Sequence, residues 1–179
     1  MVWTAPMTFT ANTVLTAAQL NVYLRDNFNE TAPAKATTAG YHFVSTGTGA
    51  ISERPVDFNY IETGESTTST SFTNLTTAGP QLTLTTGSRV LWMINAYQNN
   101  SISNNSAYAG VAITGASSIP ASTSRSASTD GLGAGQNSRA GYFHMESGLT
   151  PGSNTFTMQY MVAAGSGTFA FRRLVIICF

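Results

Sequence analysis

The chain has 179 residues, of which 9% are charged, and its eight Lys and Arg balance eight Asp and Glu to give no net charge. Globular proteins usually contain about 25% charged residues, so Ser, Thr, Asn, Gln and Gly must supply most of this polar surface. A nucleic-acid-binding protein needs a basic face to displace counterions, and this charge balance does not provide one. The length predicts one domain with an appendage, and the sparse charge favours a protein held in an assembly.

The first thirty residues are predicted to form an extended arm and one short helix. Pro6 favours an extended arm over residues 1–15, and Thr16 with Gln19 forms a capping-box pattern that starts a helix. Pro33 predicts that this helix stops near Glu30. A helix this short is marginal alone and needs its own β domain, a symmetry mate or a foreign protein to pack on. The residues expected to anchor the arm and helix are Trp3, Phe9, Leu20, Tyr23, Leu24 and Phe28.

The next residues contain Pro33, Gly40, Gly47, Gly49 and Pro55 among Thr and Ala. This composition predicts an anchoring strip that ends at residue 40 and a linker over residues 41–56, with at most one short strand at 41–44. The predicted domain organisation is therefore residues 1–40 for the arm, helix and strip, 41–56 for the linker, and 57–179 for a β domain.

From Asp57 onward the hydrophobic pattern has a period of two residues, which is typical of strands. No helical pattern lies between these segments, so the fold class is mainly β, an antiparallel β-sandwich or jelly roll that follows the N-terminal arm and short α-helix. The eight predicted strands are residues 57–62, 69–75, 81–85, 89–97, 108–114, 140–146, 154–162 and 168–178.

Two of these strands, with the sequences VLWMI (90–94) and LVIICF (174–179), are apolar on both faces. A two-layer sandwich normally leaves one face of each strand in water, so the pattern predicts a covered outer face, most simply in a closed cyclic oligomer. The alternative is a thick core beneath a long loop. Strand alternation sends Arg172 and Arg173 to opposite faces, so at least one of them is expected to be buried or interfacial. That arginine either pairs across subunits, with an acid or with carbonyls, or is a paired charge at the sheet rim. The candidate residues of this subunit interface are Trp92, Arg172, Arg173, Val175 and Ile177.

Two long polar loops are predicted at residues 98–106 and 115–139. The loop at 115–139 is longer than about 12–15 residues, and loops of that length are usually functional or disordered. Both loops are candidates to face a receptor. Neither loop contains Trp, Tyr or Phe, the usual sugar-stacking residues, and this counts against glycan binding. The candidate receptor-facing residues are Asn99, Asn104, Arg125 and Asp130.

No motif points to catalysis, a metal or a cofactor. His42 and His144 have no second ligand at metal-binding spacing, and Cys178 lies in an apolar run as a small hydrophobe. The acids form no pattern that favours a catalytic pair, and the Gly-rich segment 131–136 has no helix behind it to cradle a phosphate. We therefore expect no enzyme and no cofactor. Without a signal-peptide pattern or a long apolar run, we also expect synthesis in the host cytoplasm and no membrane insertion.

The N-terminal sequence resembles structural proteins of tailed bacteriophages, particularly those of actinobacteria. These proteins carry W-x-x-P, then T-A-x-x-L-N-x-x-L-R-D-N, then an A-P-A-K-A-T-x-A-G strip. The matching residues here are Trp3, Pro6, Thr16, Ala17, Leu20, Asn21, Leu24, Arg25, Asp26 and Asn27, with the strip at Ala32 to Gly40. The resemblance covers the first quarter of the chain, and the closing strands also look like trimeric jelly rolls of the tumour-necrosis-factor type.

The resemblance implies a virion component that assembles with itself as a homotrimer. Its other expected partner is the major capsid protein or another virion protein, with a host surface as a further candidate, and neither nucleic acid nor membrane is expected. The chain lacks collagen-like repeats and a heptad stalk, so a compact knob near its support is favoured. We expect a decoration protein on the capsid surface, and the alternative is a minor tail or tail-tip protein with a receptor- or glycan-binding β domain.

Overall fold

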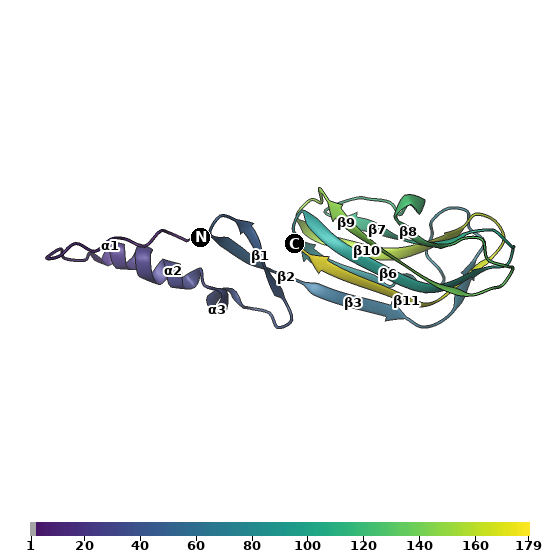
Figure 1. The fold of residues 1–179 in the computed structure, drawn as a ribbon, viewed down its shortest axis with the longest axis horizontal. Helices are drawn as coiled ribbons and strands as arrows, with labels where there is room; N and C mark the ends of the chain where they lie inside the picture. The colour runs from purple at the N-terminus through teal and green to yellow at the C-terminus, as the bar shows by residue number, and fades with distance from the viewer. Residues whose placement is uncertain (1–2) are drawn as a thin grey trace. The chain divides into compact units, whose positions relative to one another are not determined.

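The computed structural model describes residues 3–179, and Figure 1 shows them as a ribbon. The chain divides into two compact units, residues 1–54 and residues 55–179. We call them the N-terminal unit and the β body. The first contains all the α-helical segments and one hairpin, and the second is built of strands apart from one short 3₁₀ turn.

The predicted helix is present between Thr16 and Glu30. Its three segments follow without a break, as α1 (Ala17–Leu20), the π-helical η1 (Asn21–Arg25) and α2 (Asp26–Asn29). Both hydrogen bonds of the capping box at Thr16 form, with Gln19 as the partner. The widened π turn of η1 was not predicted, because the apolar spacing fits an ordinary α-helix as well.

The prediction of a linker over residues 41–56 is wrong. Strands β1 (His42–Gly47) and β2 (Ala50–Arg54) form an antiparallel hairpin. The turn between them contains Gly49 with φ of 65°, a backbone conformation that glycine adopts readily. A further helical turn, α3 (Ala32–Lys35), precedes the hairpin and begins with Pro33 in its first turn, where no backbone donor is needed.

The β body is an antiparallel sandwich, and this confirms the predicted fold class. One sheet has the order β5-β10-β7-β8, and the other has the order β3-β11-β6-β9 with β4 paired to β11. The elements are β3 (Val56–Ile61), β4 (Glu65–Thr67), β5 (Gln81–Thr86), β6 (Arg89–Asn100), β7 (Ala107–Gly115), η2 (Thr123–Arg125), β8 (Ser126–Thr129), β9 (Ser138–Ser147), β10 (Gly152–Val162) and β11 (Gly167–Cys178).

The core lies between the two sheets and is filled by the inward positions of each strand. In β6, Val90, Trp92 and Ile94 are buried, whereas the alternate residues Leu91 and Met93 are only partly covered. A large apolar side chain contributes roughly 1.5–3 kcal/mol when it is fully buried. The largest apolar and aromatic side chains with almost no exposure are Trp92, Tyr160, Phe156, Phe169, Ile113 and Met158.

Candidate functional site

The N-terminal unit presents an apolar surface built from the arm and the helix. Phe9 is 68% exposed and Phe28 63%, although both are large and apolar. Between the arm and the helix lies a hollow of about 250 Å³, lined mainly by apolar side chains. The six predicted anchoring residues all lie in this unit; Tyr23 is half-buried, and the other five are exposed: Trp3, Phe9, Leu20, Leu24 and Phe28.

Asn27 fixes the arm against the helix. Its Oδ1 accepts a hydrogen bond from the Thr4 amide at 2.9 Å, and its Nδ2 donates to the Thr4 carbonyl at 2.9 Å and to the Tyr23 carbonyl at 3.1 Å. The side chain is almost fully buried. Sequence reasoning gave Asn27 no role, although an amide inside a predicted helix, where such side chains are uncommon, was an available signal.

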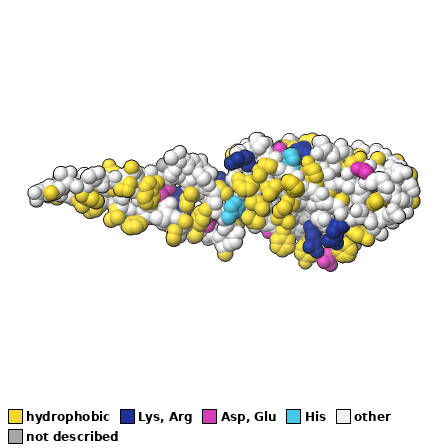
Figure 2. Space-filling view, viewed as in Figure 1, with side chains coloured by type: hydrophobic (Ala, Val, Ile, Leu, Met, Phe, Trp, Pro, Cys, Tyr) yellow, Lys and Arg dark blue, Asp and Glu magenta, His cyan; other side chains and the backbone are white. Residues whose placement is uncertain are grey.

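A second apolar surface lies on the outer face of the sheet β3-β11-β6-β9. Figure 2 shows hydrophobic side chains gathered over these strands. We define this outer face by the residues that point away from the core: Val56, Phe58 and Tyr60 on β3, Arg173, Val175 and Ile177 on β11, Leu91 and Met93 on β6, and Phe143 and Met145 on β9.

The candidate interface residues on β6 and β11 divide between the two faces of this sheet. Arg173, Val175 and Ile177 point outward, as an interface requires. Trp92 and Arg172 were predicted to lie at an interface, and this is corrected here, because their side chains are 1% and 0% exposed inside the β body. Strand alternation places Trp92 inward, and a bulge between residues 170 and 173 sets the direction of the two arginines.

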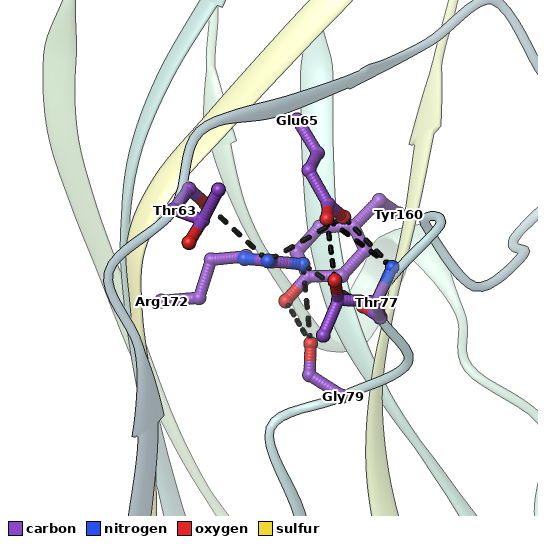
Figure 3. A network of polar contacts seen from close by, with 6 residues as sticks. All are labelled: Thr63, Glu65, Thr77, Gly79, Tyr160 and Arg172. Carbon is purple, nitrogen blue, oxygen red and sulfur yellow. Dashed lines mark hydrogen bonds and ion pairs between the residues drawn. The ribbon is translucent and has the colours of Figure 1, made fainter.

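Arg172 pairs within its own chain rather than across subunits, as Figure 3 shows. Its guanidinium donates to the carbonyls of Thr63, Thr77 and Gly79 at 3.3–3.4 Å and lies 3.5 Å from a carboxylate oxygen of Glu65. It also stands over the ring of Tyr160, 5.5 Å from the centroid. The contacts to Thr77 and Gly79 hold the irregular segment 68–80 against strand β11 within the β body.

Two groups in this network have shifted pKa values. Hydrogen bonds from the Thr77 hydroxyl and amide, together with the charge of Arg172, lower the pKa of Glu65 below its ordinary value of 4.5. Burial raises the pKa of the Tyr160 phenol, which donates to the Gly79 carbonyl at 2.9 Å. Both shifts stabilise the protonation states that the network uses, an ionised Glu65 and a neutral Tyr160.

The candidate receptor-facing residues do not form one site. The side-chain amide of Asn99 donates to the side-chain oxygen of Asn137 at 2.9 Å, and Asn137 lies just before the first residue of β9. The main-chain N–H of Asn104 donates to the Leu132 carbonyl at 2.9 Å. Asp130 accepts hydrogen bonds from Ser106, which precedes β7, and from Ser128 on β8, a strand inside the segment predicted as a loop. Arg125 instead pairs with Glu146 near the other end of β9.

Within residues 3–179, no three His, Cys, Asp or Glu side chains are close enough together to bind a metal ion. Among the same residues, no helix has the length and apolar content needed to span a bilayer. His144 packs its ring 5.4 Å from Trp92 and 6.3 Å from Tyr142, in an aromatic group at the edge of the core. Its surroundings are those of a packed side chain.

Comparisons with known proteins show the class of fold. No family model matches the sequence, and no curated protein matches it. Among solved structures, a T=1 particle derived from infectious bursal virus is similar with a TM-score of 0.50 at 9% identity, over 75% of this chain and 35% of that one. The VP2 subviral particle of infectious bursal disease virus also gives 0.50 at 9% identity, over 75% and 37%.

This chain therefore spans about a third of the length of the viral proteins that it matches. At 9% identity the likeness establishes a shared β-sandwich fold, of the kind found in viral capsid proteins. A carbohydrate-binding module from a Cellvibrio mixtus lichenase is similar over 83% of this chain and 94% of that one, at 14% identity, but its TM-score of 0.29 is too low to carry an argument.

Proposed function

We propose that this chain is a structural protein of a tailed-phage virion, a homotrimeric decoration protein of the capsid surface that its N-terminal unit anchors to the shell. The resemblance of residues 3–40 to phage structural proteins supports this role. The sandwich fold that the β body shares with viral capsid proteins is consistent with it. In this proposal the anchoring partner is the major capsid protein or a neighbouring virion protein.

The apolar surface of the N-terminal unit is the observation that carries the proposal. Large side chains in this unit, among them Phe9 and Phe28, lie in water instead of a core. The charges nearby largely neutralise each other, because Arg25 pairs with Asp26 and Lys35 with Glu30. Such a surface fits a neutral, apolar groove on a partner. The hydrogen bonds of Asn27 to the arm and the helix hold this surface in a defined shape before binding, which lowers the entropic cost of association.

The anchor is tested by replacing Phe9, Leu24 and Phe28 together with Ser in the full chain. Each side chain is more than half exposed, so each substitution should remove about 1 kcal/mol of binding and the triple variant should bind roughly 100-fold more weakly. Co-sedimentation with phage particles that lack the protein measures this affinity. The matched control is Ile102→Ser, which replaces an exposed apolar residue of the β body and should bind normally. Unchanged binding by the triple variant would exclude the anchor.

The alternative role is that of a minor tail or tail-tip protein. The observation that favours it is the pair of packed polar loops around Asn104 and Asp130, which could offer amide and carboxylate groups to a host receptor. Electron microscopy of particles that carry a labelled chain distinguishes the two locations. Label over the head supports decoration, and label at the tail tip supports the alternative.

A further inference from the structure

The outer face of the sheet β3-β11-β6-β9 is organised in rows of residues that face one another across four strands. One row runs through Phe58, Val175, Met93 and Phe143, and each residue is the register partner of the next. The adjacent row runs through Val56, Ile177, Leu91 and Met145 in the same way. Cross-strand partners lie on one face of a sheet, so eight neighbouring positions form an uninterrupted apolar surface.

This surface is large enough to be an interface between proteins. Phe143 is 73% exposed, Phe58 66%, Tyr60 52% and Met145 49%. An aromatic side chain presents about 150–250 Å², so the whole face leaves on the order of 700 Å² of apolar area in water. The largest apolar patch on a typical monomer is about 300–600 Å². One partner in a standard interface buries about 800 Å², which is close to what this face offers.

The charged residues at the edge of the face carry both signs. Arg173 and Glu62 line the same hollow, of about 310 Å³, together with Phe58, Tyr60 and Val175. Within residues 3–179, neither charge makes an ion pair. A foreign partner would have to supply both signs of charge at this edge. A second copy of the chain carries both, so in a closed ring of copies Arg173 of one face can meet Glu62 of the next.

We infer that the outer face of this sheet binds a second copy of the same chain, with the two apolar rows forming the centre of the contact. Arg173 and Glu62 lie at the rim, where charges mainly set orientation and specificity. The inference rests on the proposed function only for the number of copies, three. The face lies on a sheet of the β body, whereas the proposed anchor lies on the N-terminal unit.

The test is the mass of the full chain in solution, measured by sedimentation equilibrium between about 1 and 50 µM. The wild type should have three times the 18.9 kDa mass of the chain. The double variant Phe58→Glu with Phe143→Glu places charge in one apolar row and should raise the dissociation constant at least 100-fold, giving monomers. Phe143→Leu, which stays apolar, and Ile102→Glu, at an exposed apolar position that is not part of this face, should keep the wild-type mass.

A second measurement needs no variant and so does not depend on whether a variant folds. Hydroxyl-radical footprinting of the wild-type chain should oxidise Phe58, Phe143 and Met145 several-fold more slowly in concentrated than in dilute samples. Phe9 should be oxidised equally in both. Equal oxidation of the outer face at all concentrations would overturn the inference.

The other outcomes are also decisive. The inference is overturned if the wild type is a monomer over the whole concentration range, or if the double variant leaves the assembly intact. A monomer is also the result expected if another virion protein or a saccharide covers the face. A dimer that the double variant dissociates supports the face and corrects the number of copies. Binding of particles through the N-terminal unit is a separate measurement, so a monomer that still attaches would sink this inference and leave the proposed anchor standing.

Discussion

Arg172 shows how one buried charge holds a segment without regular strands. Between residues 68 and 80 the chain has only one bridge to a neighbouring strand, from Thr73 to Tyr160. The Arg172 guanidinium donates hydrogen bonds to the carbonyls of Thr77 and Gly79 in this segment and to the carbonyl of Thr63. The sequence indicated that one of the two arginines was buried or interfacial. It could not indicate which one, because the bulge in β11 determines the face of the sheet on which each side chain lies.

Replacing Arg172 with Met should destabilise the β body by about 3–5 kcal/mol, because the carbonyls and Glu65 lose their common buried partner. Urea denaturation followed by tryptophan fluorescence measures the free energy of unfolding. Arg89→Met is the control, since Arg89 is exposed at the start of β6 and should change stability by no more than about 0.5 kcal/mol. A loss below about 1 kcal/mol for Arg172→Met would contradict the role given to the network.

The lowered pKa of Glu65 predicts a dependence of stability on pH. A carboxyl whose pKa falls on folding stabilises the native state above its unfolded value, here near 4.5, and loses that effect as the pH falls through the folded value. The wild type should therefore be more stable than Glu65→Gln at pH 7, and the two should converge as the pH drops below about 4.5. Denaturation curves at several pH values test this. A gap of constant size down to pH 3 would show that ionisation of Glu65 is not involved.

At the scale of elements, periodicity identified seven strands of the β body and missed the two shortest, β4 and β8. β6 and β11 could be predicted because each is a long segment rich in β-branched and aromatic residues. Residues 69–75 alternate as well, yet they make no strand, because the Ser69 hydroxyl donates to the Ser71 carbonyl and accepts from its amide, a local turn that competes with sheet pairing. The short strands β4 and β8 and the hairpin β1-β2 depend on partners distant in sequence or on a glycine turn, which composition does not reveal.

The hydrogen bonds by which Asn27 joins the arm to the helix lead to a second prediction at this scale. Asn27→Ala removes three hydrogen bonds of a buried amide, so the arm should detach locally, with a loss of about 1–3 kcal/mol. Hydrogen exchange of the Thr4 amide should accelerate accordingly. Asn21→Ala is the matched control, because Asn21 is an exposed asparagine of the same helix and should leave exchange unchanged. Equal exchange in both variants would show that other contacts hold the arm.

At the scale of the whole molecule, the chain is two compact units, each with an apolar surface that its own core does not use. The sequence predicted both surfaces, from apolar residues of the predicted helix such as Leu20 and Leu24 and from the apolar run over residues 174–179. It could not separate the lining of the core from the outer face, because in a strand that is apolar on both sides Trp92 and Met93 look alike. Only the register across β11, β6 and β9 assigns each residue to its side.

Both apolar surfaces contain few charges, so the ionic strength of the medium has little to act on. Added salt screens attraction between ions, and it leaves contact between hydrocarbon groups intact or strengthens it. Cold and chaotropes act in the opposite direction, because they weaken the tendency of water to expel such groups. Any assembly held by these surfaces should therefore tolerate high salt and be loosened by chilling or urea.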